Sequence, residues 1–382
     1  MLSIDMLPAG KGDCLWIEYG RGPDLRRLLV DGGMPGTAEV LRARISSMAP
    51  APCRFELLVV THIDLDHIGG ILDLLRRPPS NLVLGDVWFN GWPQLEESAQ
   101  RGMSEKISRS TSGTDDDDVL GVRQGEDLSG WIQAGGYPWN AAFGGGPVVI
   151  EPAGELPRRQ LAGDLRLTLL APTRQRLDAL RQVWKEEVRW AGEKPGEVLL
   201  RLGEERSDRR EEDEEILGAA LDVEALARSR WPADASKANG TSIALLLEHD
   251  GKRCLLAGDS YAGDVTESVL GLAGEESEST LRIDALKLSH HGGRKSTSIE
   301  LIESLACPRF LFSTNGAQHR HPDRESVARV IVHGKRSGLR PCLCFNYRTE
   351  QTSLWDDADL FRRYPYALEY PVPGEEGLRV EL

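Results

Sequence analysis

The amino-acid sequence predicts an α/β protein built as a four-layer αββα sandwich. Short apolar runs typical of β-strands occur in both halves of the chain and are separated by turn residues. Helical segments accompany the strands in each half, so two β-rich halves with outer helices are expected. The length of 382 residues fits one large domain, residues 1–382, that carries insertions.

The first half begins with a predicted hairpin, followed by alternating helices and strands. Strands are expected at residues 13–19, 27–30, 55–60 and 81–90, and helices at residues 35–47 and 68–77. Residues 20–23 form the hairpin turn, and Pro78 and Pro79 end the second helix. A polar loop therefore lies between the buried strand 55–60 and the helix that follows it.

The second half consists of further strands and is separated from the first by unusual segments. Its strands are expected at residues 165–170, 241–248, 252–257, 283–288, 309–313 and 341–347. Residues 91–163, rich in glycine, serine, aspartate and tryptophan, are expected to be an irregular loop insertion. Residues 174–236 are expected to be a charged helical insertion, because their first part shows an apolar stripe at helical spacing.

The charge balance narrows the choice of partners. The chain has 46 basic and 60 acidic residues, a formal net charge of −14, which argues against binding long nucleic acid over the whole surface. The acidic runs 115–118 and 211–215 fall in the insertions, where we expect them to be solvated or to contact a protein partner. Lys287, Arg294 and Lys295 are expected to attract an anion locally.

Cysteine usage and hydropathy indicate the compartment. The six cysteines include no CxxC pair, and no apolar segment is long enough for a signal peptide or a membrane span. We therefore expect a cytoplasmic protein with no membrane partner. Cys342 and Cys344 share one face of a predicted strand, where buried thiols are favoured over a metal or redox site.

The strongest functional signal is the sequence THIDLDHIGG, residues 61–70, directly after a buried strand. It places four side chains that can bind metal within six residues: His62, Asp64, Asp66 and His67. Imidazole suits zinc and similar ions, whereas carboxylates favour harder ions such as manganese. The motif therefore predicts a metal site where the strand ends.

This motif resembles the HxHxDH signature of the metallo-β-lactamase superfamily, in the HxDxDH form typical of ComEC-type DNA-uptake proteins. Further matches occur in family order, at residues 9–14 and 30–33 before this motif and at residues 255–259, 286–293 and 321–322 after it. The resemblance implies a metallo-β-lactamase αββα sandwich with two insertions. ComEC itself is a multi-helix membrane protein, so the chain resembles only its hydrolase domain, here free-standing and soluble.

The resemblance also implies a centre for two divalent ions, Zn or Mn, with Asp259 between them. The ligands would be His62, Asp64 and Asp259 for the first ion, and Asp66, His67, Asp259 and one of His290 and His291 for the second. Strand alternation lets only one of the two adjacent histidines face the metal; we favour His291, and an exchange with His290 stays open. The superfamily's middle histidine has no counterpart in residues 238–242, so the first ion is expected to be weakly held.

Asp66, His290 and His321 are the candidate catalytic residues. Asp31 is expected to orient a histidine, and Asp13 either supports the site or caps a turn. These features favour a metal-dependent hydrolase, a phosphodiesterase or nuclease that uses a hydroxide activated by two ions. Short or single-stranded substrates suit the acidic protein best. The alternatives are a hydrolase of small esters, lactones or lactams, and a partner-binding effector subunit of a multiprotein system.

Overall fold

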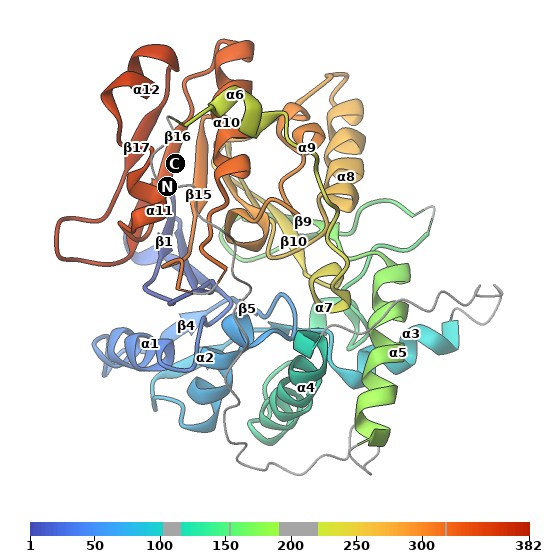
Figure 1. Cartoon of the computed structure of the whole chain (residues 1–382). Coiled ribbons are helices and arrows are strands. Elements are labelled where there is room, and N and C mark those ends of the chain that lie inside the picture. Colours follow the sequence, from blue (N-terminus) through green and yellow to red (C-terminus); the bar gives the residue numbers. More distant parts are fainter. Residues whose placement is uncertain (102–115, 153, 191–220, 318) are drawn as a thin grey trace.

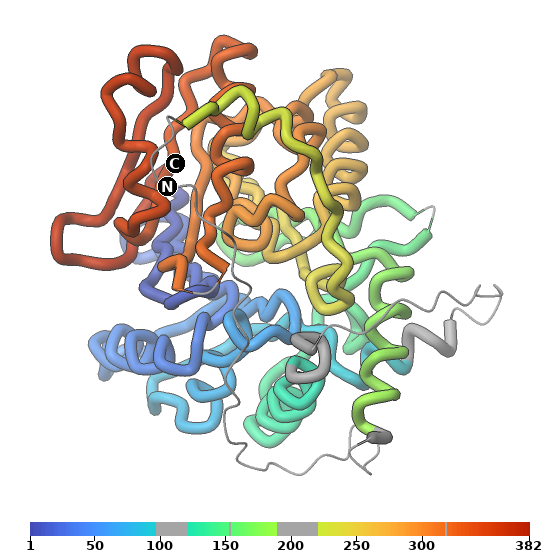
Figure 2. Tube along the Cα trace, viewed as in Figure 1, coloured from blue at the N-terminus to red at the C-terminus, as the bar shows by residue number. Residues whose placement is uncertain are grey.

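The computed structural model describes residues 1–101, 116–152, 154–190, 221–317 and 319–382 and has the predicted four-layer αββα architecture. Two β-sheets face each other, and helices cover the outer side of each sheet (Figure 1). The two termini lie side by side, since the first strand pairs with the last (Figure 2). The acidic run 211–215 lies outside the described residues.

The first sheet has six strands and comes from the first half of the chain, completed by the last strand. In spatial order they are β18 (Leu378–Glu381), β1 (Leu2–Met6), β2 (Leu15–Tyr19), β3 (Arg26–Val30), β5 (Leu57–Val59) and β7 (Val87–Trp88). β2 and β3 form the predicted hairpin. Leu15 and Ile17 face the second sheet and Trp16 faces the helices, as the two-residue period of a strand requires.

The second sheet has eight strands and comes from residues 158–369. In spatial order they are β17 (Ala367–Glu369), β16 (Cys342–Phe345), β15 (Arg309–Phe312), β13 (Ala285–Lys287), β11 (Lys252–Leu256), β10 (Ala244–His249), β9 (Arg166–Ala171) and β8 (Arg158–Gln160). The five strands from β11 to β17 in this sheet are parallel neighbours. Their carboxyl ends therefore lie along one edge.

Helices close both outer faces. The first sheet is covered by α1 (Thr37–Ser46), α2 (Leu65–Arg76), α3 (Trp92–Arg101), α4 (Asp116–Ala134) and α5 (Arg174–Trp190). The second is covered by α6 (Val223–Ala227), α8 (Ala262–Glu275), α9 (Ile299–Glu303), α10 (Arg324–Ser337) and α12 (Ala358–Arg363). The short helices α7 (Lys237–Gly240) and α11 (Glu350–Ser353) lie in loops, and β4 (Cys53–Phe55) with β6 (Leu82–Leu84), and β12 (Leu281–Arg282) with β14 (Leu305–Ala306), form two small sheets.

The prediction of an irregular insertion over residues 91–163 is wrong for its described helical parts, α3 and α4. Glycine has a low helix propensity, so the glycines of α4 hid this helix in the sequence. One of them allows α4 to pack closely against a neighbouring helix. A Cβ atom at Gly125 would lie 2.3 Å from the ring of Trp184 on α5, so the close approach of the two helices needs glycine. Trp92 also packs beside Trp184 and is buried, so it anchors the start of α3 to the protein body.

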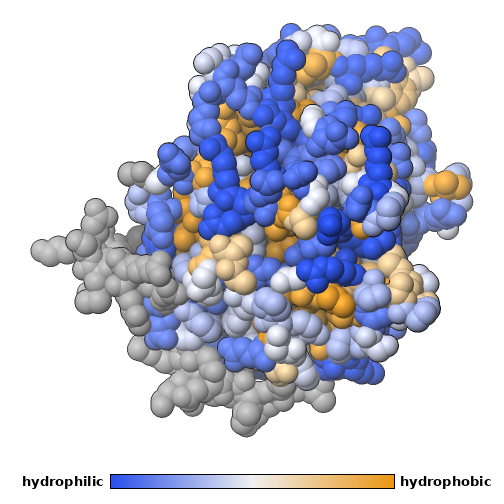
Figure 3. Space-filling view, turned by 180° about the vertical axis from the view of Figure 1, so that it is seen from behind, coloured by the Kyte–Doolittle hydropathy of each residue, from blue (hydrophilic) through white to orange (hydrophobic). Residues whose placement is uncertain are grey.

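The surface fits a charged protein. On the face seen from behind, hydrophilic residues alternate with smaller hydrophobic areas (Figure 3). Within the described ranges, no helix combines the length and the apolar character needed to cross a membrane.

Candidate metal centre

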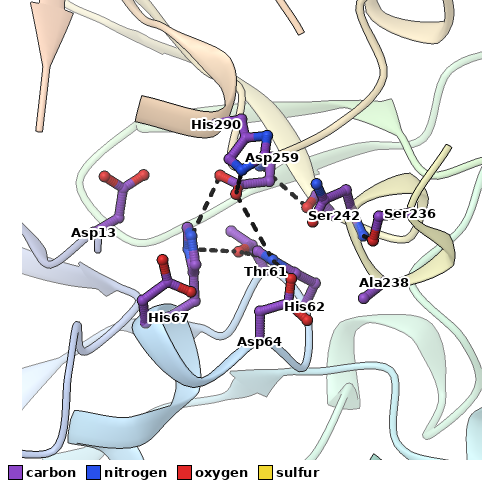
Figure 4. A network of polar contacts seen from close by, with 12 residues as sticks. Asp13, Thr61, His62, Asp64, His67, Ser236, Ala238, Ser242, Asp259 and His290 are labelled. Carbon is purple, nitrogen blue, oxygen red and sulfur yellow. Dashed lines mark hydrogen bonds and ion pairs between the residues drawn. The ribbon is translucent and has the colours of Figure 1, made fainter. Parts of the chain in front are cut away.

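The candidate site lies where strands of both sheets end. β3 and β5 are parallel neighbours in the first sheet, and they lead into Asp31 and into Thr61-His62. β11 and β13 are parallel neighbours in the second sheet, and they lead into Asp259 and into His290-His291. Segments that lie about 200 residues apart in sequence therefore meet at one point (Figure 4).

The start of α2 positions the predicted motif. Asp64 is the N-cap residue, with extended backbone dihedral angles, and Asp66 and His67 lie in the first helical turn. The Asp64 side chain does not cap the helix; its Oδ2 atom lies 3.3 Å from Nε2 of His62. A loop residue and a helix start thus turn all four side chains toward the centre.

Asp259 lies in the middle of this arrangement, almost fully buried (Figure 4). Its Oδ1 atom is 3.3 Å from Nε2 of His67. Its Oδ2 atom lies 3.9 Å from Nε2 of His62, 3.8 Å from Nε2 of His291 and 3.9 Å from Nε2 of His290. One carboxylate therefore faces four imidazole nitrogens.

The two adjacent histidines both reach the centre, so the reasoning from strand alternation was wrong. β13 ends before them, and both His290 (φ 50°) and His291 (φ 57°) adopt the left-handed conformation in a tight turn. His291 is buried, with Nε2 3.3 Å from Nε2 of His67 and 3.4 Å from Oδ2 of Asp66. His290 is more exposed and approaches Asp259 from another side.

A second set of polar groups contacts the outer nitrogens of His67 and His291. Asp31 lies 2.8 Å from Nδ1 of His67, and it also accepts hydrogen bonds from the backbone and hydroxyl of Thr61. Nδ1 of His291 lies 2.9 Å from the carbonyl oxygen of Ser313. Because these contacts fix the outer nitrogens, the Nε2 atoms point inward, as in metal-binding histidines. The expected orienting role of Asp31 agrees with this geometry.

Asp13 supports the site. Its Oδ1 atom lies 3.3 Å from Nδ1 of His291, and its Oδ2 atom accepts a 2.6 Å hydrogen bond from Nζ of Lys287. A Cβ atom at the preceding residue, Gly12, would lie 1.7 Å from the carbonyl oxygen of Asp66, so only glycine lets this loop pass so close. Lys287 is fully buried by this pair, and the expectation that it attracts a substrate anion is wrong.

Asp234 is a residue that the sequence did not reveal. It comes from the segment before α7, inside the predicted insertion 174–236, and its Oδ2 atom lies 3.6 Å from Nδ1 of His290. Asn239 donates a 2.7 Å hydrogen bond to the same oxygen, and Ser296 lies 3.3 Å from it. No motif surrounds Asp234, so only the folded chain identifies it.

His321 lies at the rim. Its ring centre is 5.3 Å from that of His290, and its Nδ1 atom is 3.3 Å from Oδ1 of Asp323. The remaining candidate cations, Arg294 and Lys295, are exposed just beyond the histidine turn.

Carboxylates dominate the electrostatics. Although burial opposes charge on the imidazoles, Asp259 and Asp31 raise the pKa of His67, and Asp259 and Asp13 raise the pKa of His291 to about 9. Burial also opposes charge on Asp13 and would raise its pKa, but the positive charges of Lys287 and His291 lower this pKa to about 2. The site thus favours bound positive charge.

The donor atoms fit divalent ions. Within the described chain, His62 Nε2, Asp64 Oδ1 and Asp259 Oδ1 are buried without a hydrogen bond, a costly state that a bound cation would relieve. Asp13, His67, Asp259 and His291 can each bring one donor atom within 4.8 Å of the others. Asp13 already contacts Lys287 and the outer nitrogen of His291, so we interpret it as a support for the site and not as a ligand.

The chain belongs to the metallo-β-lactamase superfamily. The model of this family matches residues 7–200, which contain the motif of residues 61–70. No curated protein matches the sequence significantly.

Solved structures give distant similarities over the whole chain. A mutant of the β-hydroxylase CmlA shares 13% identity at a TM-score of 0.39, and this chain spans 54% of that protein. Zn²⁺-bound PqqB from Methylobacterium extorquens shares 11% identity at a TM-score of 0.38, and the match covers all of both chains. Values this low carry no information about the substrate.

Proposed function

We propose that the protein is a metal-dependent phosphodiesterase or nuclease, similar to the hydrolase domain of ComEC-type proteins. The observation that carries the proposal is the position of Asp259, whose Oδ1 atom faces His67 and whose Oδ2 atom faces the Nε2 atoms of His62, His290 and His291. Two divalent ions bound there would supply a water of lowered pKa and positive charge for the entering and leaving oxygens.

The family resemblance divides the ligands around Asp259 into two groups. His62 and Asp64 would hold the first ion, while Asp66, His67 and His291 would hold the second. Asp31 and Asp13 keep the imidazoles of His67 and His291 in place. Zn and Mn both suit this mixture of imidazole and carboxylate donors.

A phosphodiester suits this charge distribution. Three carboxylates, Asp64, Asp66 and Asp259, leave two divalent ions with residual positive charge, and an anionic substrate that gains negative charge in its transition state balances it. Arg294 and Lys295 are the exposed cations that would attract such a substrate.

His290 can fulfil one of two roles. Its Nε2 atom lies 3.9 Å from the Asp259 oxygen that His62 also faces, so it could replace the histidine missing from residues 238–242. Alternatively, it acts with His321 on the leaving group. The metal content of His290→Ala separates these roles: loss of one ion identifies a ligand, whereas reduced turnover with both ions retained identifies a proton donor.

The test of the proposed function combines metal analysis with two substrates. The purified chain should contain up to two Zn or Mn ions and should hydrolyse a chromogenic phosphodiester. Asp259→Asn and His67→Ala should lose bound metal and at least about 100-fold in activity. This loss is larger than the one expected for a residue that only orients a metal ligand. His333→Ala, on α10, serves as the control and should leave both unchanged. Rapid hydrolysis of a chromogenic lactam or lactone with no phosphodiester turnover would overturn the proposal in favour of the small-ester alternative.

A further inference from the structure

A second group of side chains with metal-binding atoms lies in the large sheet, outside the site of Asp259. Cys342 and Cys344 are two residues apart on β16, so their side chains share a face. Glu369 is the residue of the parallel neighbour β17 that pairs with Cys344. Strand register, and not sequence proximity, therefore brings the carboxylate to the two thiols.

The spacing of the three donor atoms fits one tetrahedral ion. The Sγ atoms of Cys342 and Cys344 are 3.9 Å apart, and Sγ of Cys344 is 3.5 Å from Oε2 of Glu369. An ion with bonds of about 2.3 Å to sulfur and about 2.0 Å to oxygen separates its ligands by about 3.8 Å and 3.5 Å, respectively. The donor atoms of the three side chains thus form a cluster of the size of a metal site.

Access and charge also suit a cation. Cys344 is buried, Cys342 is partly exposed and Glu369 is exposed, so an ion can enter from solvent and keep a water as its fourth ligand. In the described part of the chain, Glu369 contacts the Cys344 thiol and has no ion pair with a basic side chain.

We propose that Cys342, Cys344 and Glu369 form a binding site for a thiophilic divalent ion of the zinc class. Both thiols release their protons when the ion binds, and the thiolates and the carboxylate supply three ligands. The site lies at the edge strand of the sheet, and its existence does not depend on the proposed hydrolase activity.

Cadmium titration of the reduced full-length chain tests this site. Thiolate-to-cadmium charge-transfer absorption reports on it alone, because the described donors of the Asp259 centre include no cysteine. We expect the absorption to saturate at one equivalent and to be lost in Cys342→Ser and in Cys344→Ser. Glu369→Gln, a change at an exposed position, should keep the fold and weaken cadmium binding about tenfold or more.

The buried cysteines elsewhere provide matched controls. Cys254→Ser and Cys307→Ser should retain the absorption, and circular dichroism should confirm that each variant is folded. No absorption in the wild-type chain, or full absorption in folded Cys344→Ser, overturns the site.

Discussion

Every histidine around Asp259 has a polar group at its outer nitrogen, and Asp234 is the one beside His290. Its carboxylate is itself fixed by Asn239 and Ser296, so it can hold the imidazole in one orientation. Partners of this kind commonly contribute 10- to 100-fold to metal affinity or activity. The geometry of the site therefore depends on residues that bind neither metal nor substrate.

We predict that Asp234→Asn lowers phosphodiester turnover about 10- to 100-fold while the chain stays folded. The neutral amide no longer favours the orientation in which Nε2 of His290 faces Asp259. Steady-state kinetics and metal analysis measure the effect, with Asp284→Asn, which removes a carboxylate paired with Lys252, as the control. Wild-type turnover in Asp234→Asn would show that His290 needs no support from this carboxylate.

At the scale of single elements, a buried ion pair fixes the end of β13 beside the site. Lys287 is its last residue, and the ammonium group contacts Asp13 and the carbonyl oxygen of Leu288. Removing one partner of a buried pair leaves the other charge uncompensated. This pair therefore joins the β13 end of the second sheet to the loop before β2.

We expect Lys287→Met to lower the free energy of unfolding by about 3 kcal/mol, because the buried Asp13 carboxylate then loses its lysine partner and keeps only the contact with His291. Urea denaturation measures the loss. Lys295→Met, an exposed neighbour, should change stability by less than about 0.5 kcal/mol. If the double variant Asp13→Asn/Lys287→Met is no more stable than Lys287→Met, the uncompensated charge is not the cause.

Helix α4 carries a carboxyl group whose ionisation opposes folding. Burial raises the pKa of Asp127 to about 6, although Arg123 lies nearby. Because this value is above the unfolded value of about 4, the stabilisation by the bound proton is present at low pH and is lost as the pH rises through about 6.

Asp127→Asn should consequently raise the free energy of unfolding by about 1 kcal/mol at pH 8, a figure reduced for partial exposure of the group, and by less at pH 5. Denaturant titrations at the two pH values measure the difference. Asp164→Asn, at an exposed turn, is the control and should show no such pH dependence. An equal effect of Asp127→Asn at both pH values would contradict the raised pKa.

At the scale of the whole molecule, a net charge of −14 opposes the approach of a polyanion. Arg294, which also contacts Glu325, and Lys295 are exposed cations close to the histidine turn and reduce this opposition locally. A short or single-stranded substrate brings fewer charges near the acidic surface than a long duplex does. Substrate length and salt should therefore distinguish a phosphodiesterase from a hydrolase of neutral esters.

We predict that cleavage of a single-stranded oligonucleotide rises with Mn, falls with added salt and exceeds cleavage of long duplex. In Arg294→Ala/Lys295→Ala the slope of log affinity against log salt should decrease by about 1 to 1.5, as expected for two lost phosphate contacts. Arg362→Ala/Arg363→Ala, two exposed cations on α12, should leave the slope unchanged. An identical slope in the wild-type chain and both double variants would exclude Arg294 and Lys295 from substrate binding.

The sequence determined the architecture and the centre of the site because both depend on local patterns. Strand period placed β2, β3 and β5, and the order of residues 61–70 marked the start of α2 as a metal-binding turn. The late motifs added Asp259 and the histidine pair. Each of these features is contained in a few adjacent residues, so its physical meaning can be read without the fold.

The tertiary structure decided the contacts that join distant parts of the chain. Asp234 meets His290, Lys287 is neutralised by Asp13, and Glu369 reaches Cys344 only through the register of β16 and β17. None of these pairs has a sequence signature, because each depends on the packing of elements and not on local spacing. The folded sheets therefore fix which charges are buried, which stay available to a substrate, and where a second metal site can form.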